Sequence, residues 1–168
     1  MKSLLSLPAL PKPGHRLDLP SLAASADALA LAQLARPGQL LTVVTASPLE
    51  AQRLAEEMAW FAPDLRVHLL PDWETLPYDH FSPHQDLISE RLATLYAVSQ
   101  SQCEVLITAA STAITRLAPP SFLAAHTFFM KKGERLEIDK LRAQLTLAGY
   151  QHVTQVVAAG EYSVRGGL

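Results

Sequence analysis

The chain has 168 residues, of which 49% are hydrophobic and 18% are charged, and its formal net charge is −2. This length suits one domain, or one domain and the start of a second, and the apolar content excludes a disordered chain. The near-neutral charge does not indicate a dedicated nucleic-acid-binding surface, because such surfaces usually come with a clear basic excess.

Residues 1–20 are predicted to be extended, because prolines recur at Pro8, Pro11 and Pro13. The same prolines interrupt the apolar core that a secretory signal needs. No apolar run in the chain reaches membrane-spanning length. We therefore expect a cytoplasmic protein that does not enter a membrane.

Residues 21–126 are predicted to alternate helices and strands. In chain order these are a helix at 22–34, a strand at 39–46, a helix at 47–61, a strand at 66–70, a helix at 86–98, a strand at 104–109 and a short helix at 111–117. The strands are short apolar runs without polar alternation, which is typical of strands covered on both faces. This order predicts an α/β domain with a parallel sheet.

The helix at 47–61 begins with the pattern of a capping box. Ser47 suits the N-cap, Pro48 suits the first helical position, and Glu50 stands three residues after the cap. A helix start can also bind an anion. Because cap and box residues are both present, a plain helix cap is the better interpretation.

The segment between the second strand and the next helix is rich in aromatic residues and proline. Trp73, Tyr78 and Phe81 are predicted to pack their rings and hold this loop rigid, which is a structural role. Glu90 and Arg91 are predicted to lie on the solvent face of the helix that follows. The opposite, apolar face of that helix is predicted to consist of Leu87, Ile88, Leu92, Leu95 and Tyr96.

Metal ligands are sparse in the chain. Cys103 is the single cysteine, so an internal disulfide and a cysteine-based zinc site are excluded, and a small buried thiol is expected. His80 and His84 have the four-residue spacing of zinc ligands on a helix. Pro83 lies between them and disfavours a helix there, so we expect no metal site.

The sequence offers no clear site for nucleotide hydrolysis or acid–base catalysis. A nucleotide-hydrolysing sheet needs a GxxxxGK[ST] loop after its first strand, and the chain has none. Lys131 and Lys132 precede Gly133, which is the wrong order to cradle a phosphate at a helix start. Asp72 and Glu74 could act as an acid–base pair, but no nucleophile stands beside them in the sequence. Helix capping and solvated charge explain these two carboxylates better.

After residue 126 the pattern changes to an α+β one, with a boundary near 126–131. The predicted elements are a strand at 127–130, a helix at 136–148 ended by Gly149, and strands at 153–157 and 162–165. The part from residue 131 onward has a net charge of +2, against −4 before it. A mildly basic face for an acidic partner and a solvated helix face both fit this charge. The last strand has no closing element, so we expect a piece of a longer protein.

Arg165 is the candidate partner-binding residue. In a strand at 162–165, Ser163 and Arg165 would project from the same face. The planar guanidinium fork binds a carboxylate at two points, which suits protein recognition. An ordinary surface arginine fits the same pattern.

Several of these segments, in this order, resemble the N-terminal region of the bacterial transcription-repair coupling factors (Mfd). They are LPDWETLPYDHFSPHQDLISERLATLY, VLITAASTAITRL, MKKGERL, LRAQLTLAGY and GEYSVRGG. The resemblance implies that residues 21–126 form a parallel-sheet, helicase-like domain similar to the first domain of UvrB but lacking its phosphate loop. It also implies that residues 127–168 begin a smaller α+β domain that binds UvrA.

The resemblance further implies a function. The chain would be a non-catalytic part of a protein that couples stalled RNA polymerase to nucleotide excision repair by recruiting UvrA, with Arg165 as a contact. ATP, magnesium and the contacts with polymerase and DNA would belong to missing parts, so no cofactor or catalytic residue is expected here. Other domains of the same parent protein would be further partners.

Two alternatives stay open at this point. The first is a degenerate UvrB-type domain that still binds or hydrolyses nucleotide. The second is a small-molecule enzyme that uses Asp72, Glu74 and the histidines.

Overall fold

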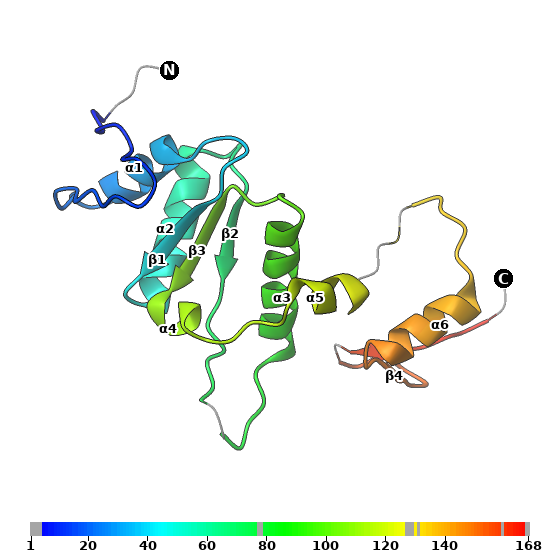
Figure 1. Cartoon of the computed structure of the whole chain (residues 1–168). Helices are drawn as coiled ribbons and strands as arrows, with labels where there is room; N and C mark the ends of the chain where they lie inside the picture. The colour runs from blue at the N-terminus through cyan, green and yellow to red at the C-terminus, as the bar shows by residue number, and fades with distance from the viewer. Residues whose placement is uncertain (1–4, 77–78, 127–129, 131, 159, 167–168) are drawn as a thin grey trace. The chain divides into compact units, whose positions relative to one another are not determined.

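The computed structural model describes residues 5–76, 79–126, 130, 132–158 and 160–166 (Figure 1). The chain divides into two compact units, Met1–Asp72 with Ala97–Thr115, and Trp73–Tyr96 with Arg116–Leu168. The first unit holds α1 (Ala26–Leu34), β1 (Leu41–Thr45), α2 (Pro48–Phe61), β2 (Val67–Leu70), β3 (Val105–Ala109) and α4 (Ala110–Ala113). The second holds most of α3 (Gln85–Ser99), and α5 (Pro120–His126), α6 (Ile138–Leu147), β4 (Gln151–His152) and β5 (Glu161–Tyr162). None of the described helices is both long enough and apolar enough to span a membrane.

The first unit is built on a three-stranded parallel sheet, which confirms the predicted α/β class. The strand order is β1-β3-β2, so β3 lies in the centre. Ile107 is level with Val43 of β1 on one side and with Leu69 of β2 on the other. Parallel strands need crossover connections, and α2 lies in the one that leads from β1 to β2, on the far side of β3.

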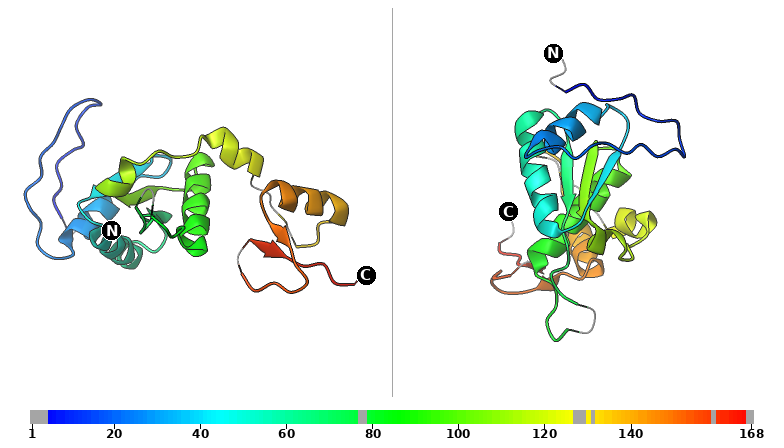
Figure 2. Two further views of the ribbon diagram at one scale, coloured as in Figure 1. Left: turned by 90° about the horizontal axis from the view of Figure 1, so that it is seen from below. Right: turned by 90° about the vertical axis from the view of Figure 1, so that its left-hand side faces the viewer.

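Helix α2 covers one face of this sheet and forms the core with it (Figure 2). Leu54 and Met58 of α2 are buried together with Val105 and Ile107 of β3. Helix α1 packs against α2. The remaining buried or partly buried members of this cluster are Ala28, Leu31, Ala32, Ala35, Leu41, Val43, Ala51, Ala55, Phe61, Leu65, Val67 and Leu69.

An ion-pair bridge ties α1 to α2. The Arg53 guanidinium of α2 lies 2.7 Å from Asp27 of α1 and 2.6 Å from Glu57 of α2. The hydrogen bond from Arg53 holds the pKa of Asp27 below its usual range. These side chains are about one-third exposed, so the bridge fixes the position of α1 more than it adds to stability.

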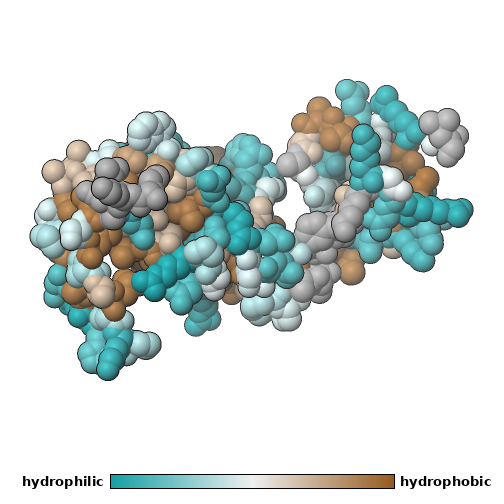
Figure 3. Space-filling view, turned by 90° about the horizontal axis from the view of Figure 1, so that it is seen from above, coloured by the Kyte–Doolittle hydropathy of each residue, from teal (hydrophilic) through white to brown (hydrophobic). Residues whose placement is uncertain are grey.

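The structure corrects the prediction that all three strands are covered on both faces. Strand β3 is mostly buried, as predicted, but Thr42 and Val44 of β1 are exposed, and Val44 is 55% exposed. Strand β1 is at the edge of the sheet described here, and its side chains on the face away from α2 are exposed. Figure 3 shows apolar residues at the surface of this part of the molecule.

Three helices in the first 126 residues also differ from the prediction. Helix α4 ends at Ala113 rather than near residue 117. Helix α1 begins at Ala26 rather than near residue 22, because Ala24 has a left-handed backbone (φ 48°) that ends any earlier helix. Helix α5 was not predicted, because Pro119 and Pro120 were read as a stop. Proline at the first helical position is tolerated, since its missing N–H has no partner there anyway, and α5 starts in this way at Pro120.

The C-terminal elements agree with the prediction only in part. Helix α6 is followed by Gly149 (φ 87°), the predicted stop. Strands β4 and β5 have two residues each and pair in parallel. The predicted strand at 153–157 is wrong, because these residues form the loop after β4, and the predicted strand at 162–165 coincides with β5 only at Tyr162. The predicted strand at 127–130 falls mostly outside the described residues, and the boundary near 126–131 stays a prediction.

The predicted cap of α2 is confirmed. Ser47 Oγ accepts a hydrogen bond from the Glu50 N–H at 3.2 Å. Glu50 Oε2 in turn accepts one at 3.3 Å from the N–H of Ala46, one residue earlier than the capping box would place it. The side chains of Ser47 and Glu50 thus accept hydrogen bonds from backbone N–H groups at the amino end of α2.

We expect Ser47→Ala to lower the free energy of unfolding by about 1 kcal/mol, because the Glu50 N–H loses its acceptor. Urea denaturation of the two proteins measures this difference. The matched control is Ser82→Ala, at an exposed position outside any helix or strand. Equal stability of the Ser47 variant and the control would show that the cap contributes nothing.

Candidate functional site

Proteins of the α/β class usually bind ligands at the carboxyl edge of the parallel sheet. At this edge, polar side chains form hydrogen bonds with one another. Asp72 follows β2, and its Oδ2 accepts hydrogen bonds from the hydroxyl groups of Ser111 and Thr112, each at 2.8 Å. Both hydroxyls belong to α4, which follows β3 directly. The carboxylate therefore joins the end of β2 to α4. Glu74, its suggested acid–base partner, is exposed.

The aromatic loop is the segment between β2 and α3. A stack between an arginine of α3 and a tryptophan of this loop joins the two. The Arg91 guanidinium lies over the Trp73 ring, 4.0 Å from its centroid. Arg91 is only 2% exposed, so the prediction that it lies on the solvent face of α3 is wrong. The guanidinium is planar and weakly hydrated, so an indole face can replace much of its water.

Of the other two rings of this loop, the structure tests only Phe81, which does not show the predicted packing. Phe81 is 82% exposed, so its predicted role in holding the loop is wrong. Tyr78 lies outside the described residues. On α3, Leu92 is exposed although it was predicted to face the core, while Thr94 and Ala97 are buried. The buried stripe of α3 therefore passes through Arg91, Thr94 and Ala97.

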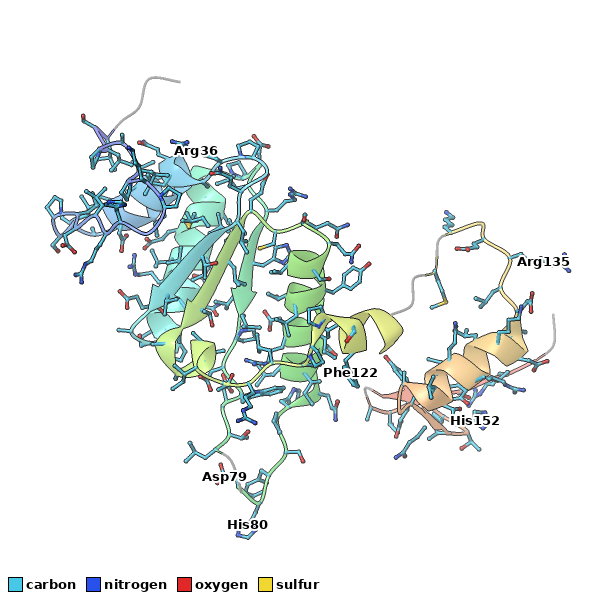
Figure 4. The ribbon with its side chains drawn as sticks, viewed as in Figure 1. Arg36, Asp79, His80, Phe122, Arg135 and His152 are labelled. Atoms are coloured by element: carbon cyan, nitrogen blue, oxygen red, sulfur yellow. The ribbon has the colours of Figure 1, made fainter. Side chains whose placement is uncertain are left out.

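The histidines of the loop are exposed. Asp79 and His80 lie at its far end (Figure 4). His84 Nδ1 lies 3.4 Å from Asp86 Oδ2 and accepts a hydrogen bond from the Asp86 N–H at 3.3 Å, so it sits at the start of α3. Within the described ranges, no three side chains from His, Cys, Asp and Glu come close enough together to hold a metal ion.

Arg165 lies beside the loop that connects β4 to β5. Its Nη2 donates a hydrogen bond to the backbone carbonyl of Thr154 at 3.1 Å, and Ser163 Oγ donates to the same oxygen at 3.1 Å. The predicted common face of Ser163 and Arg165 is therefore present. The strand that was to supply it ends at Tyr162, so the two side chains project from an extended segment beyond β5.

The carboxylate of Glu161 organises the same loop. Its Oε2 accepts hydrogen bonds from the N–H groups of Val157 (2.8 Å) and Ala158 (3.0 Å). These two donors stabilise the ionised form and lower the pKa of Glu161. Glu161, Ser163 and Arg165 alternate along the chain, and all three bind the loop. We call these three residues the loop clasp.

A hollow of about 470 Å³ opens beside the loop clasp, lined by Gln155, Val156, Ser163 and Arg165. Arg165 is exposed, and it forms no ion pair with any residue in the described part of the chain. The hollow thus offers one apolar side chain, an amide, a hydroxyl group and a guanidinium to an incoming group. It suits a carboxylate that has an apolar neighbour.

Sequence reasoning singled out Arg165 as a candidate, gave no role to Glu161 and placed Arg91 on the solvent face. The alternation of polar residues at Glu161, Ser163 and Arg165 was a usable signal, because it places three polar side chains on one side of an extended segment. The burial of Arg91 had a weaker signal in the sequence. Arg91 stands three residues after Ile88, and residues at this spacing are neighbours on a helix surface.

The chain is similar to several proteins that share one name. No protein-family model matches it. It is 42% identical over 173 aligned residues to the transcription-repair-coupling factor of Haemophilus influenzae, across 100% of the chain and 15% of that protein. It is 47% identical over 158 residues to the Escherichia coli K12 protein of the same name, across 94% of the chain and 14% of that protein. The Mycobacterium bovis protein is 34% identical over 152 residues. The chain thus spans only about one-seventh of the length of these relatives.

Proposed function

Because the chain is homologous over its length to a segment of the transcription-repair-coupling factors, we propose that it is a non-catalytic adaptor segment of such a factor. In the intact protein it helps to recruit UvrA to RNA polymerase stalled at a lesion, in the cytoplasm. The homology carries the family assignment. The UvrA contact is supported by the exposed guanidinium of Arg165 beside the hollow.

We propose that the sheet of the first unit is a UvrB-like scaffold that does not use nucleotide. The support is the missing GxxxxGK[ST] sequence together with the capped amino end of α2, where Ser47 and Glu50 occupy the place at which a phosphate would bind. ATP, magnesium, DNA and polymerase are handled by other parts of the parent protein, and those parts are further partners of this segment.

Arg165→Ala in the full-length factor is expected to weaken UvrA binding about tenfold or more, because a charge-assisted hydrogen bond contributes roughly 1.5–3 kcal/mol. The melting temperature should stay nearly unchanged, since the only described bond lost is an exposed one to Thr154. Calorimetric titration with purified UvrA measures the affinity.

The control for this experiment is Arg142→Ala on α6, whose ion pair with Asp139 is long (4.0 Å) and exposed. It removes the same charge from the same part of the chain and should leave the affinity unchanged. Wild-type affinity in the Arg165 variant would refute the proposed contact.

A further inference from the structure

We draw no further inference here: the strongest candidate, the outer face of the edge strand β1 on which Thr42 and Val44 are exposed, carries none, because nothing in the described part of the structure shows what covers it.

Discussion

Replacing Ile107 with alanine is expected to lower the free energy of unfolding of the first unit by about 2–5 kcal/mol. Ile107 is fully buried at the centre of β3, which is itself the central strand. Its side chain belongs to the core cluster that α2 forms with the sheet through Leu54 and Met58. The variant loses the transfer free energy of three carbon atoms and leaves a cavity that a parallel sheet cannot readily close.

Urea denaturation, followed by circular dichroism, measures this loss. The control is Val44→Ala on β1, a β-branched residue of the same sheet that is 55% exposed, and it should change stability by about 0.5 kcal/mol or less. If the two variants were equally destabilised, burial against α2 would not be the main source of stability in this unit.

Arg91→Ala is expected to destabilise the protein by about 2–4 kcal/mol, although a charged helix residue is usually tolerant of this change. The variant loses the stack on Trp73 and leaves a void where a long side chain was almost fully buried. Arg91→Lys keeps the charge but cannot stack a flat group on the indole, so an intermediate loss is expected.

The neighbouring Glu90→Ala serves as the control, because Glu90 is exposed on the same helix and should change stability by about 0.5 kcal/mol or less. Thermal and urea unfolding of all three variants give the comparison. A stable Arg91→Ala protein would mean that the guanidinium is only loosely held and that the aromatic loop does not depend on it.

The sequence predicted the elements of the first unit well where local and long-range forces agree. The α2 cap could be read from Ser47, Pro48 and Glu50, because capping depends on residues close together in the chain. The β3 run is apolar throughout, and it is the central strand. The exposure of β1 could not be read in this way, since an apolar run does not say which strand stands at the edge.

The prediction put Arg91 on the solvent face of its helix, because reading a hydrophobic pattern treats every arginine as exposed. Its burial depends on Trp73, which lies 18 positions earlier and reaches it only through the folded loop. The residue type can be read from the sequence, but whether the side chain is buried depends on the tertiary structure.

Around the candidate residue Arg165, the sequence predicted which neighbour shares its side but not the loop that both side chains bind. Arg165 and Ser163 do share a side, as period-two reasoning required. The Val153 to Val157 run looked like a strand because it is β-branched and apolar. It is a loop instead. The Val153 N–H still donates to the Tyr162 carbonyl, but the Thr154 carbonyl and the Val157 N–H bond to side chains, including the carboxylate of Glu161.

The cap of α2 has a consequence for protein engineering. Grafting a glycine-rich phosphate loop between β1 and α2 would not by itself create an ATP site. Glu50 already holds a carboxylate at that helix end, where it would repel the triphosphate and compete for the same dipole. A redesign would have to remove the acid as well as add the glycines, so nucleotide binding at this helix end would need more than a new loop.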